Sequence, residues 1–213
     1  MRILKFLICM MAVCAISTIP ARSESAKSVL DKTAEKLKNS GGISASFLAT
    51  SFKAKEAIGS ASGTIYVQGN KFKITSPRTT TWFDGKRQWS LMTGSDEAYV
   101  SEPTTEELQT INPYTFVNLY KSGYKMSMKD ATYSGKSCYE VVLQAKKKSS
   151  QIPAMIITID KSTFQPRCIR IKQQNGNWLR IQVYSMTTGQ SWNANFFEFS
   201  QSEFPQVDVI DLR

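Results

Sequence analysis

The sequence predicts a mainly β protein with some α-helix, in which a large antiparallel sheet curls into an open barrel. Apolar and polar residues alternate with a period of two along about eleven segments of the chain. Turn-forming pairs such as Gly69-Asn70 and Asp84-Gly85 separate some of these segments, as in β-hairpins. The alternation also leaves one face of each segment polar, which is typical of an antiparallel sheet with one wet face.

The first 23 residues have the pattern of a secretory signal peptide. A positively charged start precedes an apolar run over 6–19, and residues 21–23 offer the small side chains that a signal peptidase reads. The alternative is a membrane anchor, but such a span needs roughly 20 apolar residues. We therefore predict a signal peptide over 1–23, export to the periplasm, and a single domain over 24–213.

The charge of the chain suggests contact with anionic partners. The formal net charge is +10, and removal of residues 1–23, which hold three basic residues and no acid, lowers it to +7. Such a charge suits transient contact with anionic lipid head groups, and it also suits nucleic acid. No zinc-finger or RNA-binding signature accompanies the scattered basic residues, so we expect no nucleic-acid partner. The cluster over 146–148 is interpreted as a solvated hairpin loop.

The chain contains no histidine, which argues against an enzyme. Its absence removes Ser-His-Asp and Cys-His catalysis and the usual general base. Of the four cysteines, only Cys138 and Cys168 remain after removal of residues 1–23. They are too few for a zinc site without histidine, and one predicted strand lies between them, which disfavours a disulfide. We therefore expect no metal site.

One acidic cluster is the nearest candidate for a catalytic centre. Glu102, Glu106 and Glu107 flank Pro103-Thr104-Thr105, which resembles the first turn of a helix. Acids are favoured at that position by the helix dipole. We interpret the cluster as structural.

The elements follow in order along the mature chain. A helix is expected over 25–40, with an apolar stripe at three- and four-residue spacing that ends at Gly41-Gly42. A Gly/Ser/Ala-rich turn is expected after the first strand, and a helical insertion over 103–120 is broken at Asn112-Pro113. The expected strands cover 43–50, 65–67, 72–74, 79–84, 89–91, 98–101, 124–129, 139–145, 154–160, 167–173 and 178–186.

The interior of such a sheet is either filled by side chains or left open for an apolar ligand. The greasy insertion over 103–120, the aromatic residues on strands and the scattered methionines favour a ligand cavity. Aromatic and methionine stripes are more often plain core, so the sequence pattern alone leaves both possibilities open.

At this point the chain resembles a known family. Residues 63–67 (GTIYV), 71–74 (KFKI) and 82–89 (WFDGKRQW) are similar to the core of the outer-membrane lipoprotein carrier proteins, which are called LolA-like. The leading helix and a C-terminal strand around Phe197-Glu198-Phe199 fit the same family. The stretch over 100–114 looks more like the divergent branch found in Bacteroides-type bacteria.

The resemblance implies a fold and a function. It implies an unclosed β-barrel of about eleven strands with a helical lid over a hydrophobic cavity. It also implies a monomeric periplasmic chaperone that takes acylated lipoproteins from an inner-membrane ABC transporter and carries them toward the outer membrane. The family uses no cofactor and catalyses no covalent change. The family's lid-locking arginine has no counterpart near Gly69-Asn70, so control of the lid is expected to differ.

Alternation along the strands then predicts which residues face the ligand. A register error of one residue would turn a strand's set to the other face. The expected cavity wall comprises Phe47, Ile65, Val67, Phe72, Ile74, Trp82, Trp89, Leu91, Val141, Leu143, Ile157, Ile159, Ile169, Ile171, Leu179 and Ile181. The expected lid residues, which fill the empty cavity and move aside for lipid, are Leu108, Ile111, Phe116 and Leu119.

Two other functions remain open. A sensor domain of the same fold would bind a lipid or lipoprotein and signal, although such sensors usually carry a second domain for which this chain has no room. A basic periplasmic hydrolase would need two carboxylates with separated pKa values in one cleft, and no spacing suggests such a pair.

Overall fold

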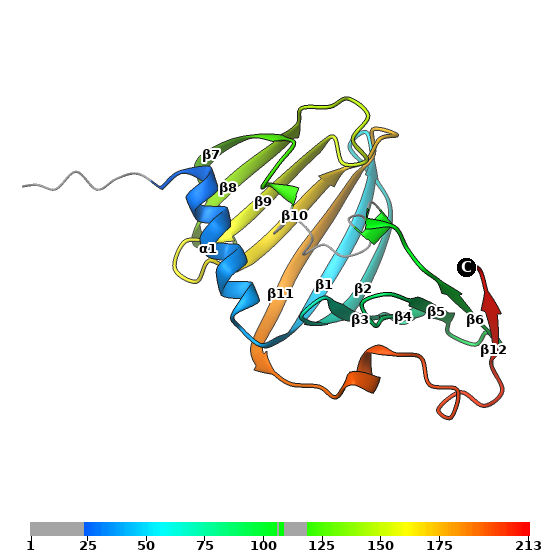
Figure 1. The fold of residues 1–213 in the computed structure, drawn as a ribbon. Helices are drawn as coiled ribbons and strands as arrows, with labels where there is room; N and C mark the ends of the chain where they lie inside the picture. The colour runs from blue at the N-terminus through cyan, green and yellow to red at the C-terminus, as the bar shows by residue number, and fades with distance from the viewer. Residues whose placement is uncertain (1–23, 106, 109–118) are drawn as a thin grey trace, which may run out of the picture.

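The computed structural model describes residues 24–105, 107–108 and 119–213, which form one long helix and a single twelve-stranded sheet (Figure 1). No helix among these residues is long and apolar enough to cross a membrane. The elements are α1 (Ala26–Lys38), β1 (Gly42–Lys53), β2 (Glu56–Gln68), β3 (Lys71–Thr75), β4 (Thr79–Phe83), β5 (Gln88–Met92), β6 (Glu97–Ser101), β7 (Tyr124–Tyr133), β8 (Lys136–Ala145), β9 (Ala154–Asp160), β10 (Pro166–Lys172), β11 (Trp178–Gln190), the short 3-10 helix η2 (Ala194–Phe197) and β12 (Asp208–Asp211).

The strand order is β12-β6-β5-β4-β3-β2-β1-β11-β10-β9-β8-β7. Two antiparallel meanders, β1 to β6 and β7 to β11, join where β1 pairs with β11, for example at Phe47 opposite Val183. The edge strands β12 and β7 do not pair with each other, so the curled sheet is unclosed, as predicted. The twelfth strand, β12, adds a parallel neighbour to β6.

Helix α1 confirms the expected leading helix. The backbone N–H of Ser28 donates a hydrogen bond of 3.1 Å to Oγ of Ser25, which caps the first turn. The apolar stripe of α1 buries Val29, Leu30 and Leu37 against the sheet. In Figure 1 the helix lies across the concave side of β7 to β11.

The Gly/Ser/Ala-rich stretch over 59–63 was expected to be a turn, and this prediction was wrong. The turn lies at Ala54-Lys55, where Ala54 has a φ of 54°, and β2 begins at Glu56. Ser60 and Ser62 pair with Thr50 and Leu48 of β1, and the stretch is largely exposed. Backbone pairing along the long strand β1 therefore outweighs the weak strand preference of these small residues.

The C-terminal strand expected around Phe197 was also wrong. Residues 194–197 form the 3-10 helix η2, in which the side chain of Asn193 accepts a hydrogen bond of 3.0 Å from the backbone N–H of Phe196. Beyond η2 the chain runs along the sheet to β12 at its far edge (Figure 1).

The sheet carries an apolar core on each face. The concave core joins α1 to β1, β2 and β7 to β11. The convex core lies over β4 to β6 and is covered by the C-terminal segment, and it comprises Trp82, Trp89, Leu91, Ala98, Val100 and Val207 with Phe199 and Phe204 packed against it.

Cys138 and Cys168 are free, buried thiols. Cys168 pairs with Thr158 across β9, whereas Cys138 pairs with Asp160, so the two thiols are offset along the sheet as well as separated by a strand. Burial raises the pKa of both thiols.

Candidate functional site

The concave face of the sheet is the candidate binding surface. Residues that pair directly across antiparallel strands share a face, and one such row runs through Val141, Ile157, Ile169 and Ile181. By the same register, thirteen of the sixteen predicted wall residues lie on this concave face. They are Phe47, Ile65, Val67, Phe72, Ile74, Val141, Leu143, Ile157, Ile159, Ile169, Ile171, Leu179 and Ile181.

The other three predicted wall residues, Trp82, Trp89 and Leu91, lie on the opposite face. Phe72 pairs with Phe83, so Phe83 shares the concave face and its neighbour Trp82 points away from it. Trp82 pairs with Trp89 of β5, so the side chains of Trp89 and Leu91 lie on the convex face as well. The placement of these three residues in the cavity wall was therefore wrong. Residues 82 and 83 are both aromatic and point to opposite faces, so alternation alone could not decide which of the two lies on the concave face.

Burial on the concave face falls from one side to the other. Val141, Leu143 and Ile157 have 0% exposure, because they lie beneath α1 and its neighbours. Toward β1, β2, β3 and β11 several residues of this face are only half-buried. This half-buried strip, which we call the apolar strip, comprises Phe47, Ala49, Val67, Ile74, Leu179 and Val183.

Gly63 provides the close approach that brings β3 and Phe47 together beside the apolar strip. A Cβ at this position would lie 2.3 Å from the carbonyl oxygen of Thr75 and 3.0 Å from the ring of Phe47. Any larger side chain would displace one of them. Gly63 therefore fixes the shape of the strip at its β2 side.

The segment that enters β7 is attached to α1 by a hydrogen bond. The Tyr120 hydroxyl donates to Oδ1 of Asp31 at 2.7 Å, and Tyr120 itself is buried. The hydrogen bond from Lys27 and then that from Tyr120 lower the pKa of Asp31, so the carboxylate stays ionised. Burial, followed by the bond to Asp31, raises the pKa of Tyr120.

Two of the four predicted lid residues fall within the described part of the chain. Leu119 is half-buried and packs against the concave core, next to the anchored Tyr120. Leu108 is half-buried in a helical turn that follows Thr104. Ile111 and Phe116 lie outside the described residues.

Glu102 and Glu107 have structural partners. The backbone N–H of Thr104 donates to the Glu107 carboxylate at 2.7 Å, and the backbone N–H of Glu107 donates to Oγ1 of Thr104 at 3.2 Å. This reciprocal pair is a capping box at the start of a helix. Glu102 forms an ion pair with Lys86, and Glu106 lies outside the described residues.

An unclosed, mainly antiparallel barrel with an apolar concave face, across which helix α1 lies, defines the class of open-barrel binding proteins. The chain belongs to the outer membrane lipoprotein carrier protein LolA family, whose sequence profile matches residues 16–176. Members of this family are carriers or binding domains rather than enzymes, and they act in the periplasm. A search of curated proteins gives no match.

Solved structures with a similar fold share little sequence with the chain. An uncharacterized conserved protein from Thermus thermophilus has a TM-score of 0.59 at 11% identity, covering 88% of this chain and 99% of that one. A LolA superfamily protein from Nitrosomonas europaea has a TM-score of 0.45 at 11% identity, covering 83% and 99%. The Pseudomonas aeruginosa MucA/MucB complex has a TM-score of 0.45 at 12% identity, covering 87% and 63%.

Proposed function

We propose that residues 24–213 form a periplasmic carrier that shields the acyl chains of lipoproteins on its concave face and moves them from the inner to the outer membrane. The single observation that carries the proposal is the apolar strip, a half-buried apolar surface continuous with the core beneath α1. Membership of the carrier family supports the same function. An inner-membrane ABC transporter that releases lipoproteins is the proposed donor.

The energetics of the strip suit a carrier that must also release its cargo. Each buried methylene contributes about 0.8 kcal/mol, so one acyl chain is worth on the order of 10 kcal/mol gross. Side chains such as Phe47 and Leu179 already have part of their apolar area covered by the rest of the protein. The free energy gained when an acyl chain binds is therefore smaller than the gross value, which keeps release possible.

The experiment that tests the proposal incubates the mature protein with spheroplasts that retain a newly made triacylated lipoprotein. Native mass spectrometry of the soluble fraction is expected to show a one-to-one complex that requires the acyl chains. Lipoprotein left entirely in the membrane would contradict the carrier function.

A pair of neighbouring substitutions tests the surface itself. Val183→Asp places a charge in the apolar strip and is expected to abolish the complex, because burying an unpaired carboxylate against acyl chains is costly. Tyr184→Asp changes the next residue, whose side chain is 62% exposed, and is expected to leave the complex intact. Circular dichroism of both variants checks that they fold. Equal retention of cargo by both would exclude the strip as the binding surface.

The same strip would also serve a sensor of lipids or lipoproteins. A carrier is expected to pass the bound lipoprotein to outer-membrane vesicles, whereas a sensor would hold it without transfer. Binding without transfer would therefore replace the carrier function with the sensing one.

A further inference from the structure

One end of the sheet gathers an excess of positive charge. One cross-strand row near this end of the sheet consists of Phe52, Trp178, Lys172, Ala154, Gln144 and Lys125. The connections that follow or precede these residues therefore lie at the same end of the sheet. These connections span 53–56, 121–125, 145–154 and 172–178, and we call them the basic rim. The rim holds a single acid, Glu56, and eight lysines: Lys53, Lys55, Lys121, Lys125, Lys146, Lys147, Lys148 and Lys172.

The basic rim accounts for the net charge of the mature chain. Its eight lysines and one glutamate give +7, which equals the whole charge left after residues 1–23 are removed from a chain of net charge +10. The rest of residues 24–213 is therefore balanced. An even scatter of lysines would not produce such a separation.

Acids pair with several basic residues elsewhere on the convex face. Glu140 pairs with Lys129 at 3.1 Å and with Arg170 at 2.6 Å. At the end opposite the rim, Asp160 pairs with Arg167 at 2.9 Å. No carboxylate in the described part of the chain forms an ion pair with the rim residues Lys125, Lys146 or Lys172.

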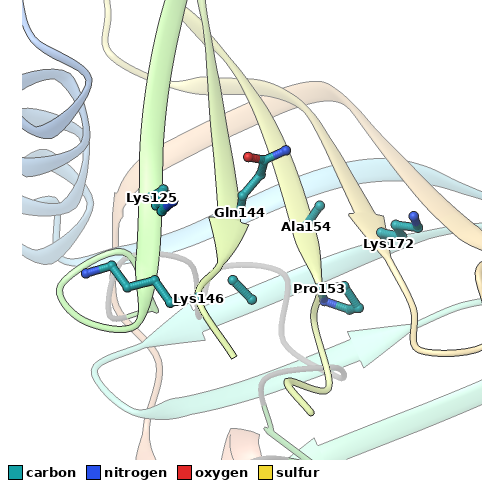
Figure 2. Close-up of a pocket in the computed structure, with 7 residues that line it drawn as sticks. Lys125, Gln144, Lys146, Pro153, Ala154 and Lys172 are labelled. Atoms are coloured by element: carbon teal, nitrogen blue, oxygen red, sulfur yellow. The ribbon is translucent and has the colours of Figure 1, made fainter. Parts of the chain in front are cut away.

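The uncompensated lysines surround a shallow hollow of about 330 Å³ (Figure 2). Lys125 and Lys146 lie on one side of it and Lys172 on the other, with Gln144 and Pro153 between them. Lys125 and Lys146 are exposed and Lys172 is half-buried. The hollow thus offers several ammonium groups to an anionic group of phosphate size.

Exposed apolar area adjoins these charges at the β1–β2 turn. Ile58 is 56% exposed and lines a second hollow together with Lys53 and Lys55. Lysines beside an exposed aliphatic side chain suit the boundary between lipid head groups and acyl chains. The rim contains no arginine, and its tyrosine and tryptophan are buried or half-buried, so it lacks the stacking groups typical of nucleic-acid binding.

We propose that the basic rim docks the protein on the anionic head-group surface of a lipid bilayer. The phosphate groups of anionic lipids are the ligands, and the lysines of 146–148 with Lys125 and Lys172 are the principal contacts. The proposal goes beyond the carrier function and stands on the charge distribution alone.

The test measures sedimentation of the mature protein with vesicles that contain phosphatidylglycerol and with vesicles of phosphatidylcholine alone. Binding is expected only to the anionic vesicles and is expected to weaken as salt rises. Each lysine near an anionic surface contributes about fivefold in affinity, so Lys146→Gln/Lys147→Gln/Lys148→Gln should weaken binding roughly a hundredfold.

The matched control removes the same charge from another surface. Lys27→Gln/Lys36→Gln/Lys38→Gln changes three exposed lysines of α1, and only a small loss of vesicle binding is expected. Equal losses in both triple variants would show a general charge effect and overturn the proposal. Tighter binding to duplex DNA than to anionic vesicles would replace the membrane with nucleic acid.

Two further measurements separate this proposal from the carrier function. The triple rim variant is expected to form the one-to-one complex when purified lipoprotein is supplied from detergent. Val183→Asp is expected to bind anionic vesicles as the unchanged protein does. Failure of vesicle binding alone would overturn the docking surface, and failure of the complex alone would overturn the carrier function.

Discussion

Replacement of Trp82 by alanine separates the stability of the sheet from its binding surface. Trp82 is 3% exposed in the convex core, where its ring lies 5.7 Å from that of Phe199 and 6.0 Å from that of Phe204. Nζ of Lys73 lies 5.3 Å from the centre of the Trp82 ring. Because these contacts attach the C-terminal segment to the sheet, their loss should destabilise the fold without touching the concave face.

The magnitude follows from the area that the side chain buries. An aromatic side chain of this kind buries about 150–250 Å². At about 25 cal/mol per Å², that area corresponds to about 4–6 kcal/mol. Because alanine keeps the Cβ, we expect a cost near the lower value of about 4 kcal/mol, which lies within the range of about 3–5 kcal/mol for such truncations. For a domain of this size, the melting temperature should fall by roughly 10 °C.

The assay combines urea unfolding with lipoprotein capture. Trp82→Ala is expected to lower the free energy of unfolding by the stated amount, yet its folded fraction should capture acylated cargo as the unchanged protein does. Tyr184→Ala, at an exposed position, should change stability by less than about 0.5 kcal/mol. A stable Trp82→Ala variant that loses its cargo would refute the reasoning and return Trp82 to the ligand wall.

Two other predictions concern packing and pH. Gly42→Ala would place a Cβ 2.4 Å from a tryptophan ring and should cost about 1–3 kcal/mol in a thermal melt, whereas Gly59→Ala meets nothing within 4 Å and should be neutral or slightly stabilising. Burial raises the pKa of Asp160, but hydrogen bonds from Ser162 and Arg167 outweigh it and hold that pKa well below its usual range. The ionised Asp160 therefore stabilises the fold fully above about pH 4, and this stabilisation is lost as the pH falls further. In Asp160→Asn, the urea midpoint of unfolding should consequently fall less steeply below about pH 4 than in the unchanged protein. An equally steep fall in both proteins would contradict this reasoning.

Local patterns predicted the parts of the fold that local physics decides. The stripe of Val29, Leu30 and Leu37 with a cap at Ser25 specifies α1 by itself. Clean alternation of Ile169 and Ile171 with charged neighbours likewise assigns β10 to a face, because only one of its faces is strongly apolar. The position and orientation of such elements can therefore be predicted from the local sequence alone.

The failures occur where distant parts of the chain decide the outcome. Serines and glycines over 59–63 become a strand only because β1 extends beyond β3 and pairs with them. Trp82 and Trp89 face the convex side because the C-terminal segment returns to cover it, which no window around these residues can show. The apolar strip was found through the register of Phe47 with Val183, which joins the two ends of the sequence.

The central place of β1 has a consequence for the time course of folding. The strand hydrogen-bonds to β2 on one side and to β11 on the other, and more than half of the chain separates Phe47 from Val183. Pairing at such sequence separation is slow, because the long intervening segment must close, at a cost in conformational entropy, before the stabilising contacts between the two strands form. A newly made chain therefore cannot complete its sheet until residues 178–190 have been synthesised, and until then β1 lacks one of its two neighbouring strands.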